Sequence, residues 1–152
     1  MKIKSLARAA AMGTAGLMVA LALSACGGGG ADVVVARPFD INVYVGGLAG
    51  SEALIRPGAI QTVYLPVGES IEFDASEPVT WRLIVGGSTI TGVGATVDYG
   101  GVSITQSVLT RSQVLIDTDS YYLLSAPLSF TLIATSTLDF AQVATIEVVL
   151  VN

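Results

Sequence analysis

The stretch that decides the fold is residues 128–135, Leu-Ser-Phe-Thr-Leu-Ile-Ala-Thr. Apolar residues occupy every second position from Leu128 to Ala134, and Ser, Thr and one Ile stand between them. Successive side chains of a β-strand point to opposite faces, so this period of two predicts a strand with one buried face. Residues 143–151 repeat the pattern, with Ala144, Ile146, Val148 and Leu150 on one face. The two stretches predict neighbouring strands of a β-structure.

Similar alternation recurs from Val33 onward, where almost no stretch has the periodicity of a helix. We expect Ser51–Ile55 to form one helical turn or a loop, residues 88–109 to contain a hairpin, and Asp117-Thr118-Asp119 to form a turn. The other expected strands are 39–45, 60–65, 71–74, 79–85, 114–116 and 121–124. About seven to nine short antiparallel strands predict an all-β sandwich, since two stacked sheets bury what one face alone cannot.

Two parts of the chain resemble a known group of domains. Gly68-Glu69-Ser70-Ile71-Glu72-Phe73-Asp74-Ala75-Ser76, followed by Trp81, is similar to the opening of bacterial immunoglobulin-like and polycystic-kidney-disease-type domains. Residues 129–135 and 144–148 look like the last two strands of these domains. Arg82–Gly87 stands where the kidney-disease-type domains usually have an Asp-rich turn. The resemblance implies an immunoglobulin-like β-sandwich.

The N-terminal segment has the layout of a secretory signal. Lys2, Lys4 and Arg8 precede an uncharged, apolar stretch from Ala9 to Ala25. Leu23-Ser24-Ala25-Cys26 resembles the lipobox of bacterial lipoproteins, which implies cleavage between Ala25 and Cys26 and attachment of lipid to Cys26. The alternatives are a membrane-spanning anchor, for which this stretch is short and interrupted by polar and glycine residues, and cleavage without lipidation.

The predicted organisation is therefore a signal peptide at 1–25, a lipidated cysteine with a glycine-rich tether at 26–32, and a sandwich domain at 33–152. Several acyl chains on Cys26 would hold the protein at a membrane of the cell envelope. Gly27 follows the cysteine where an Asp would favour the inner membrane, so the resemblance implies the outer membrane, facing the periplasm or the surface.

Composition excludes some partners. Without the signal, four arginines and twelve acidic residues leave a net charge of −8 and no lysine. Such a surface does not hold nucleic acid, because that binding depends on cationic contacts to phosphate. It is also repelled by anionic lipid, so the acyl chains must do the anchoring. Cys26 is the single cysteine, so the domain cannot contain an intrachain disulfide.

Composition also removes most catalytic chemistry. The chain has no histidine, and the domain has no lysine, so the usual triads, imidazole metal sites and Schiff bases are excluded. Glu72 and Asp74 share one face of a strand and are a remote candidate for an acid pair in hydrolysis. A solvated outer face opposite Ile71 and Phe73 is the simpler explanation of these two residues. We therefore expect no enzyme activity and no cofactor.

The leading hypothesis is a non-enzymatic binding or structural module with an envelope protein or glycan as partner. The alternative is a small-ligand or calcium-dependent glycan-binding module. Asp117 and Asp119 are weak candidates for calcium ligands, and Tyr44, Tyr121 and Tyr122 are candidates for ligand contact. The sequence does not indicate an oligomeric state.

Overall fold

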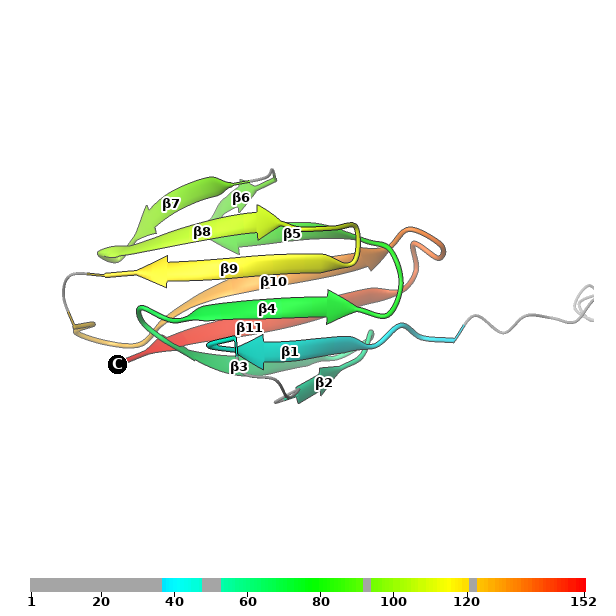
Figure 1. Cartoon of the computed structure of the whole chain (residues 1–152), viewed down its shortest axis with the longest axis horizontal. Helices are drawn as coiled ribbons and strands as arrows, with labels where there is room; N and C mark the ends of the chain where they lie inside the picture. The colour runs from blue at the N-terminus through cyan, green and yellow to red at the C-terminus, as the bar shows by residue number, and fades with distance from the viewer. Residues whose placement is uncertain (1–36, 48–52, 92–93, 121–122) are drawn as a thin grey trace, which may run out of the picture. The chain divides into compact units, whose positions relative to one another are not determined.

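The computed structural model describes residues 37–47, 53–91, 94–120 and 123–152. These residues form two β-sheets (Figure 1). The six-stranded sheet, called sheet A, has the order β2 (Ala53–Ile55), β1 (Ile41–Val45), β4 (Ser70–Ala75), β9 (Gln113–Asp119), β8 (Val102–Val108) and β7 (Ala95–Tyr99). The five-stranded sheet B has the order β3 (Ile60–Pro66), β11 (Val143–Val151), β10 (Leu128–Ser136), β5 (Val79–Val85) and β6 (Ser88–Ile90).

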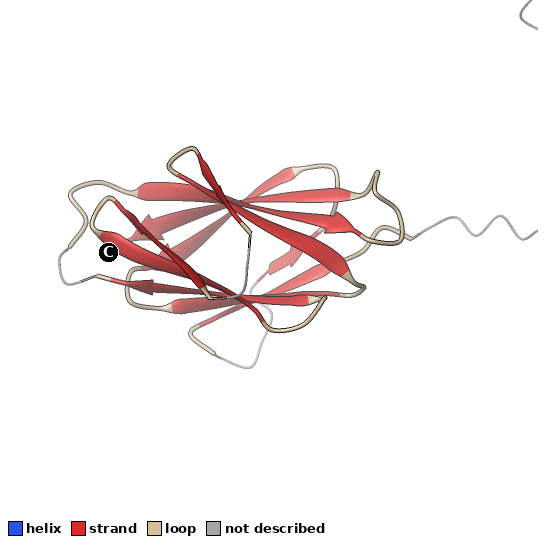
Figure 2. Cartoon of the chain, turned by 90° about the horizontal axis from the view of Figure 1, so that it is seen from above, coloured by secondary structure: helices blue, strands red, loops and turns tan. Residues whose placement is uncertain are grey.

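The sheets lie face to face, as the view in Figure 2 shows. Within the described ranges every regular element is a strand, and no helix is long and apolar enough to cross a membrane. The expected all-β sandwich is confirmed. Eleven strands are present in these ranges where seven to nine were expected, because two strands of three residues, β2 and β6, extend the sheets.

The strand order is that of an immunoglobulin-like fold. When β1, β4, β5, β8, β9, β10 and β11 are lettered A to G, sheet A contains the order A-B-E-D and sheet B the order G-F-C. These are the two sheets of an immunoglobulin domain of the constant type. All pairs are antiparallel except β3 with β11, which run parallel from Ile60 opposite Thr145 to Pro66 opposite Val151. The expectation of antiparallel strands therefore fails at this one edge.

The core forms where the inward residues of both sheets meet. Along β10, Phe130, Leu132 and Ala134 are buried, as the alternation predicts. Trp81 of β5 is also inward and lies against Phe73 of β4, on the other sheet, with ring centroids 6.4 Å apart. Each large apolar side chain removed from water contributes about 1.5–3 kcal/mol. Apolar packing thus holds the two sheets together without a disulfide.

A pair of glycines closes the β5–β6 hairpin in a tight turn. Val85 pairs with Ser88, so Gly86 and Gly87 alone connect β5 to β6, with φ of 54° and 82°. Two-residue hairpin turns of this type require positive φ at both positions, which glycine adopts without strain.

Three local expectations are wrong or incomplete. Residues 53–55 form β2 rather than a helical turn or loop, because they pair with β1 at the sheet edge. Asp117–Asp119 are the end of β9 and not a turn. Leu123 and Leu124 are not in a strand, while residues 121–122 lie outside the described residues. The predicted hairpin within 88–109 is confirmed as β7 and β8.

Candidate functional site

The structure places several of the predicted site residues on the outer face of sheet A. Glu72 and Asp74 of β4 both point away from the core and are half-buried. Tyr44 of β1 lies directly opposite Glu72, and Asn42 lies opposite Asp74. The predicted shared face of the carboxylate pair is therefore confirmed, and a tyrosine lies beside it.

Asp117 and Asp119 lie on the same outer face, two residues apart on β9. Thr118 between them points inward and is buried, and its hydroxyl donates to the Glu69 carbonyl at 2.9 Å and accepts from the Gly68 amide at 3.1 Å. These bonds to the β3–β4 turn hold β9 extended through Asp119. The two aspartates are thereby fixed to a flat strand rather than to a loop that could curl around a cation.

The outer face of sheet A is acidic as a whole. Asp98 of β7 adds to the four carboxylates above, and none of the described strands of this sheet carries an arginine or lysine. No three His, Cys, Asp or Glu side chains within the described ranges come together as a group that could hold a metal ion. Of the other predicted site residues, Ala25, Cys26, Tyr121 and Tyr122 lie outside the described residues.

The outer face of sheet B, in contrast, is mainly uncharged and partly apolar. On its edge strand β3, Ile60 is 73% exposed and Tyr64 is 65% exposed. Across the sheet Tyr64 lies beside Val149, and Ile60 lies in one row with Thr145 and Ile133. This face consists mainly of aliphatic and threonine side chains, with Arg82 and Glu147 as the charges on its described strands.

The sequence contained a signal for this surface. Val63 and Leu65 of β3 are buried, so the period of two already assigns Tyr64 to the outer face. The exposure of Tyr64 depends on the place of β3 in the sheet, because among the described strands β3 pairs with β11 alone and forms an edge. That pairing joins residues about eighty positions apart in the chain, so no local sequence pattern predicts it.

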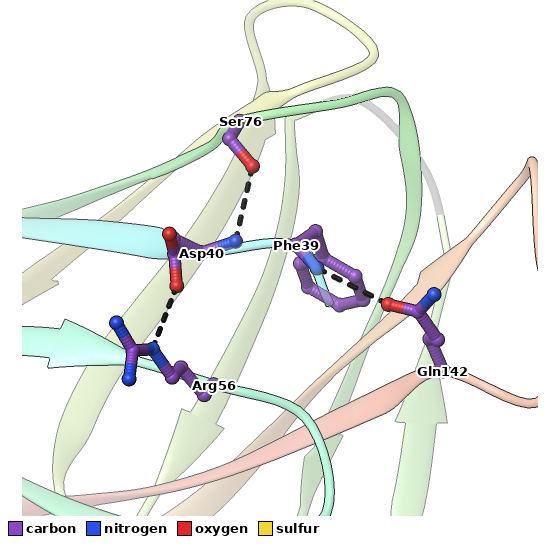
Figure 3. Close-up of polar contacts among 5 residues, drawn as sticks. All are labelled: Phe39, Asp40, Arg56, Ser76 and Gln142. Atoms are coloured by element: carbon purple, nitrogen blue, oxygen red, sulfur yellow. Dashed lines mark hydrogen bonds and ion pairs between the residues drawn. The ribbon is translucent and has the colours of Figure 1, made fainter. Parts of the chain in front are cut away.

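One end of the sandwich is held together by polar contacts around the first described residues (Figure 3). The Phe39 amide donates to Gln142 Oε1 at 3.1 Å, and the Asp40 amide donates to Ser76 Oγ at 3.0 Å. Arg56 Nε donates to Asp40 Oδ1 at 2.9 Å. The start of β1 is therefore fixed to the β4–β5 connection, to the β10–β11 hairpin and to the segment before β3.

A hollow of about 300 Å³ opens beside these contacts and is lined by Arg37, Pro38, Asp40 and Arg56. The Arg56 and Asp40 side chains are 65% and 40% exposed, so water screens their ion pair, which contributes at most about 1 kcal/mol. The described lining of the hollow therefore combines two arginines with one carboxylate at a surface open to water. Comparison of the chain with protein families, with curated proteins and with solved structures gave no match.

Proposed function

We propose that this chain is a bacterial cell-envelope lipoprotein, anchored by lipid on Cys26 in the outer membrane, that presents its sandwich as a non-enzymatic binding module. The anchor is supported by the basic start, the apolar stretch and Leu23-Ser24-Ala25-Cys26. The binding role is supported by the residue types that the domain lacks and by its surfaces. The partner is an envelope protein.

A single observation carries the choice of a protein partner, namely the exposed apolar edge of sheet B. Ile60 and Tyr64 leave most of their side-chain surface in water on a strand whose outer edge has no neighbour within the described residues. Exposed apolar surface rimmed by polar groups marks contact sites, and tyrosine is enriched at their centres. An isolated tyrosine among aliphatic and threonine side chains suits a protein surface better than the stacked rings that a glycan platform needs.

The backbone of β3 supports the same partner. An edge strand offers unpaired N–H and C=O groups, to which an extended segment of another protein adds as a further strand. Pro66 lacks an N–H and ends this edge on one side, which limits such pairing to the part containing Ile60 and Tyr64. The outward side chains of β3 would then set the specificity.

Photo-crosslinking in living cells tests the partner. A photoreactive residue at Tyr64 should give a discrete crosslinked product, and the same residue at Thr96, exposed on β7 of the acidic sheet, should not. Adding Ile60→Ser should reduce the Tyr64 product. Equal crosslinking from both sites, or none from Tyr64, would count against a binding face on sheet B.

Membrane fractionation tests the anchor separately. Cys26→Ser removes the thiol that would carry the lipid, so the chain should leave the membrane fraction or remain unprocessed. Normal processing and normal fractionation of this variant would overturn the lipoprotein assignment, whatever the crosslinking shows.

A further inference from the structure

The tip of the β10–β11 hairpin is a second exposed apolar surface. Leu138 is 74% exposed and Phe140 is 76% exposed. Leu109, in the β8–β9 connection, is 51% exposed. Figure 1 shows both connections at the end of the sandwich where the described chain begins.

Hydrogen bonds define this end and connect its parts. Gln142 bonds to the Phe39 amide at 3.1 Å and ties the hairpin to the first described residues. The Thr137 amide donates to the Pro78 carbonyl at 3.1 Å, and the Val79 amide donates to the Arg111 carbonyl at 2.9 Å. The first described residues therefore lie next to the apolar tip.

Three backbone amides of the hairpin tip, those of Leu138, Asp139 and Ala141, have side-chain acceptors within the hairpin. Ser136 Oγ accepts from the Leu138 amide at 3.1 Å and from the Asp139 amide at 3.0 Å. Asp139 Oδ1 accepts from the Ala141 amide at 3.1 Å. Because these amides already have partners, burying the tip in an apolar medium would leave them satisfied, and the fixed turn keeps Leu138 and Phe140 directed outward.

Cationic side chains gather at the same end. Three of the four arginines that follow the signal segment lie there, namely Arg37, Arg56 and Arg111, and the fourth is on β5. The nearby carboxylates of Asp40, Glu77 and Asp139 bond to Arg56, Ser136 and the hairpin itself. Among the described residues Arg37 and Arg111 have no carboxylate within ion-pair distance. The domain's negative charge is thus offset where the chain joins it.

We propose that this end of the sandwich rests on the membrane, with Leu138 and Phe140 inserted among the lipid headgroups and Arg37 and Arg111 contacting phosphates. This inference rests on the proposed lipid anchor. Residues 26–36 span at most about 40 Å even when fully extended, so the anchor keeps this end at a high local lipid concentration. Apolar side chains with arginines around them are the combination that binds the bilayer interface.

Tryptophan quenching on vesicles tests the orientation. The chain from Cys26 onward contains every core residue and one thiol, through which it is coupled to a maleimide lipid in phosphatidylethanolamine–phosphatidylglycerol vesicles with brominated acyl chains. The Phe140→Trp variant should lose emission to the bromines and shift to shorter wavelength. The matched Leu123→Trp variant, 84% exposed and joined through Leu124 to Asn152 at the other end, should stay unquenched.

A second measurement does not depend on introduced tryptophans. Cys26→Ser chains without coupling should bind the same vesicles about tenfold more weakly when Phe140 is also replaced by Ser, and Leu123→Ser should have no effect. Equal quenching at both ends, or binding unchanged by Phe140→Ser, would overturn the proposal that the end with Leu138 and Phe140 rests on the membrane. In the quenching assay, chemical coupling takes the place of lipidation, so a negative result there does not bear on the proposed lipid anchor. Fractionation of Cys26→Ser in cells tests the anchor alone.

Discussion

Phe73 and Trp81 join the two sheets across the core, with ring centroids 6.4 Å apart and ring planes at 45°. Phe73 belongs to strand B and Trp81 to strand C of the immunoglobulin order. In antibody domains the tryptophan of strand C packs against a disulfide that links strands B and F. Here an aromatic pair occupies that region of the core.

Truncation of this pair should therefore be costly. Phe73→Ala should lower the free energy of unfolding by about 3–5 kcal/mol, because it removes a fully buried ring and leaves a cavity between the sheets. Urea denaturation followed by Trp81 fluorescence measures the change. A reducing agent should leave the stability of the unaltered protein unchanged, and a loss below about 1 kcal/mol in Phe73→Ala would contradict the packing described.

Gln106 is a polar residue with no exposed surface in the middle of β8, and neither its Oε1 nor its Nε2 has a hydrogen-bond partner among the described residues. Unsatisfied buried polar atoms cost about 1–3 kcal/mol each. Gln106→Leu, of similar size, should therefore raise the free energy of unfolding. Gln106→Glu should lower it strongly, since a charge would be buried without a partner. Thermal unfolding of both variants checks this, and a destabilised Gln106→Leu would show that the amide is bonded in solution.

Gly100 and Gly101 offer a matched pair of substitutions. Both have positive φ, 59° and 84°, so replacement by Ala strains the backbone at either site by about 1–2 kcal/mol. A Cβ at Gly100 would also clash with Leu128 Cδ1, whereas no described atom lies within 4 Å of a Cβ at Gly101. Gly100→Ala should thus unfold at a lower urea concentration than Gly101→Ala. Equal midpoints would mean that Leu128 moves aside freely to make room for the added Cβ.

Calcium should not stabilise the domain through Asp117 and Asp119. The ion takes six to eight oxygen ligands, and on β9 the two aspartates lie on a flat strand whose facing neighbours across the sheet are Ser70, Thr105 and Ser103. The melting temperature should be the same with millimolar calcium as with EDTA. A rise with calcium that disappeared in Asp117→Asn would restore the calcium-dependent alternative.

The sequence predicted those parts of the fold that depend on local alternation. The inward faces of β10 and β11 and the inward position of Trp81 follow directly from the period of two. The turn predicted at Asp117–Asp119 is wrong. Aspartates favour turns locally, but here the Thr118 hydroxyl bonds to the β3–β4 turn some fifty residues away and holds the segment in β9. The carboxylate face was predictable from Glu72 and Asp74, but the edge carrying Tyr64 depends on the long-range pairing of β3 with β11.

The chain enters the domain beside Gln142, whereas Asn152 lies at the opposite end and bonds to Leu124 there (Figure 1). Tension between a membrane anchor and a load held at the last strand would therefore run lengthwise along the strands. Under such a pull the hydrogen bonds that hold β11 to β3 and β10 are sheared together rather than opened one after another. Because its two ends lie at opposite ends of the strands, the domain would resist such a pull through many hydrogen bonds at once.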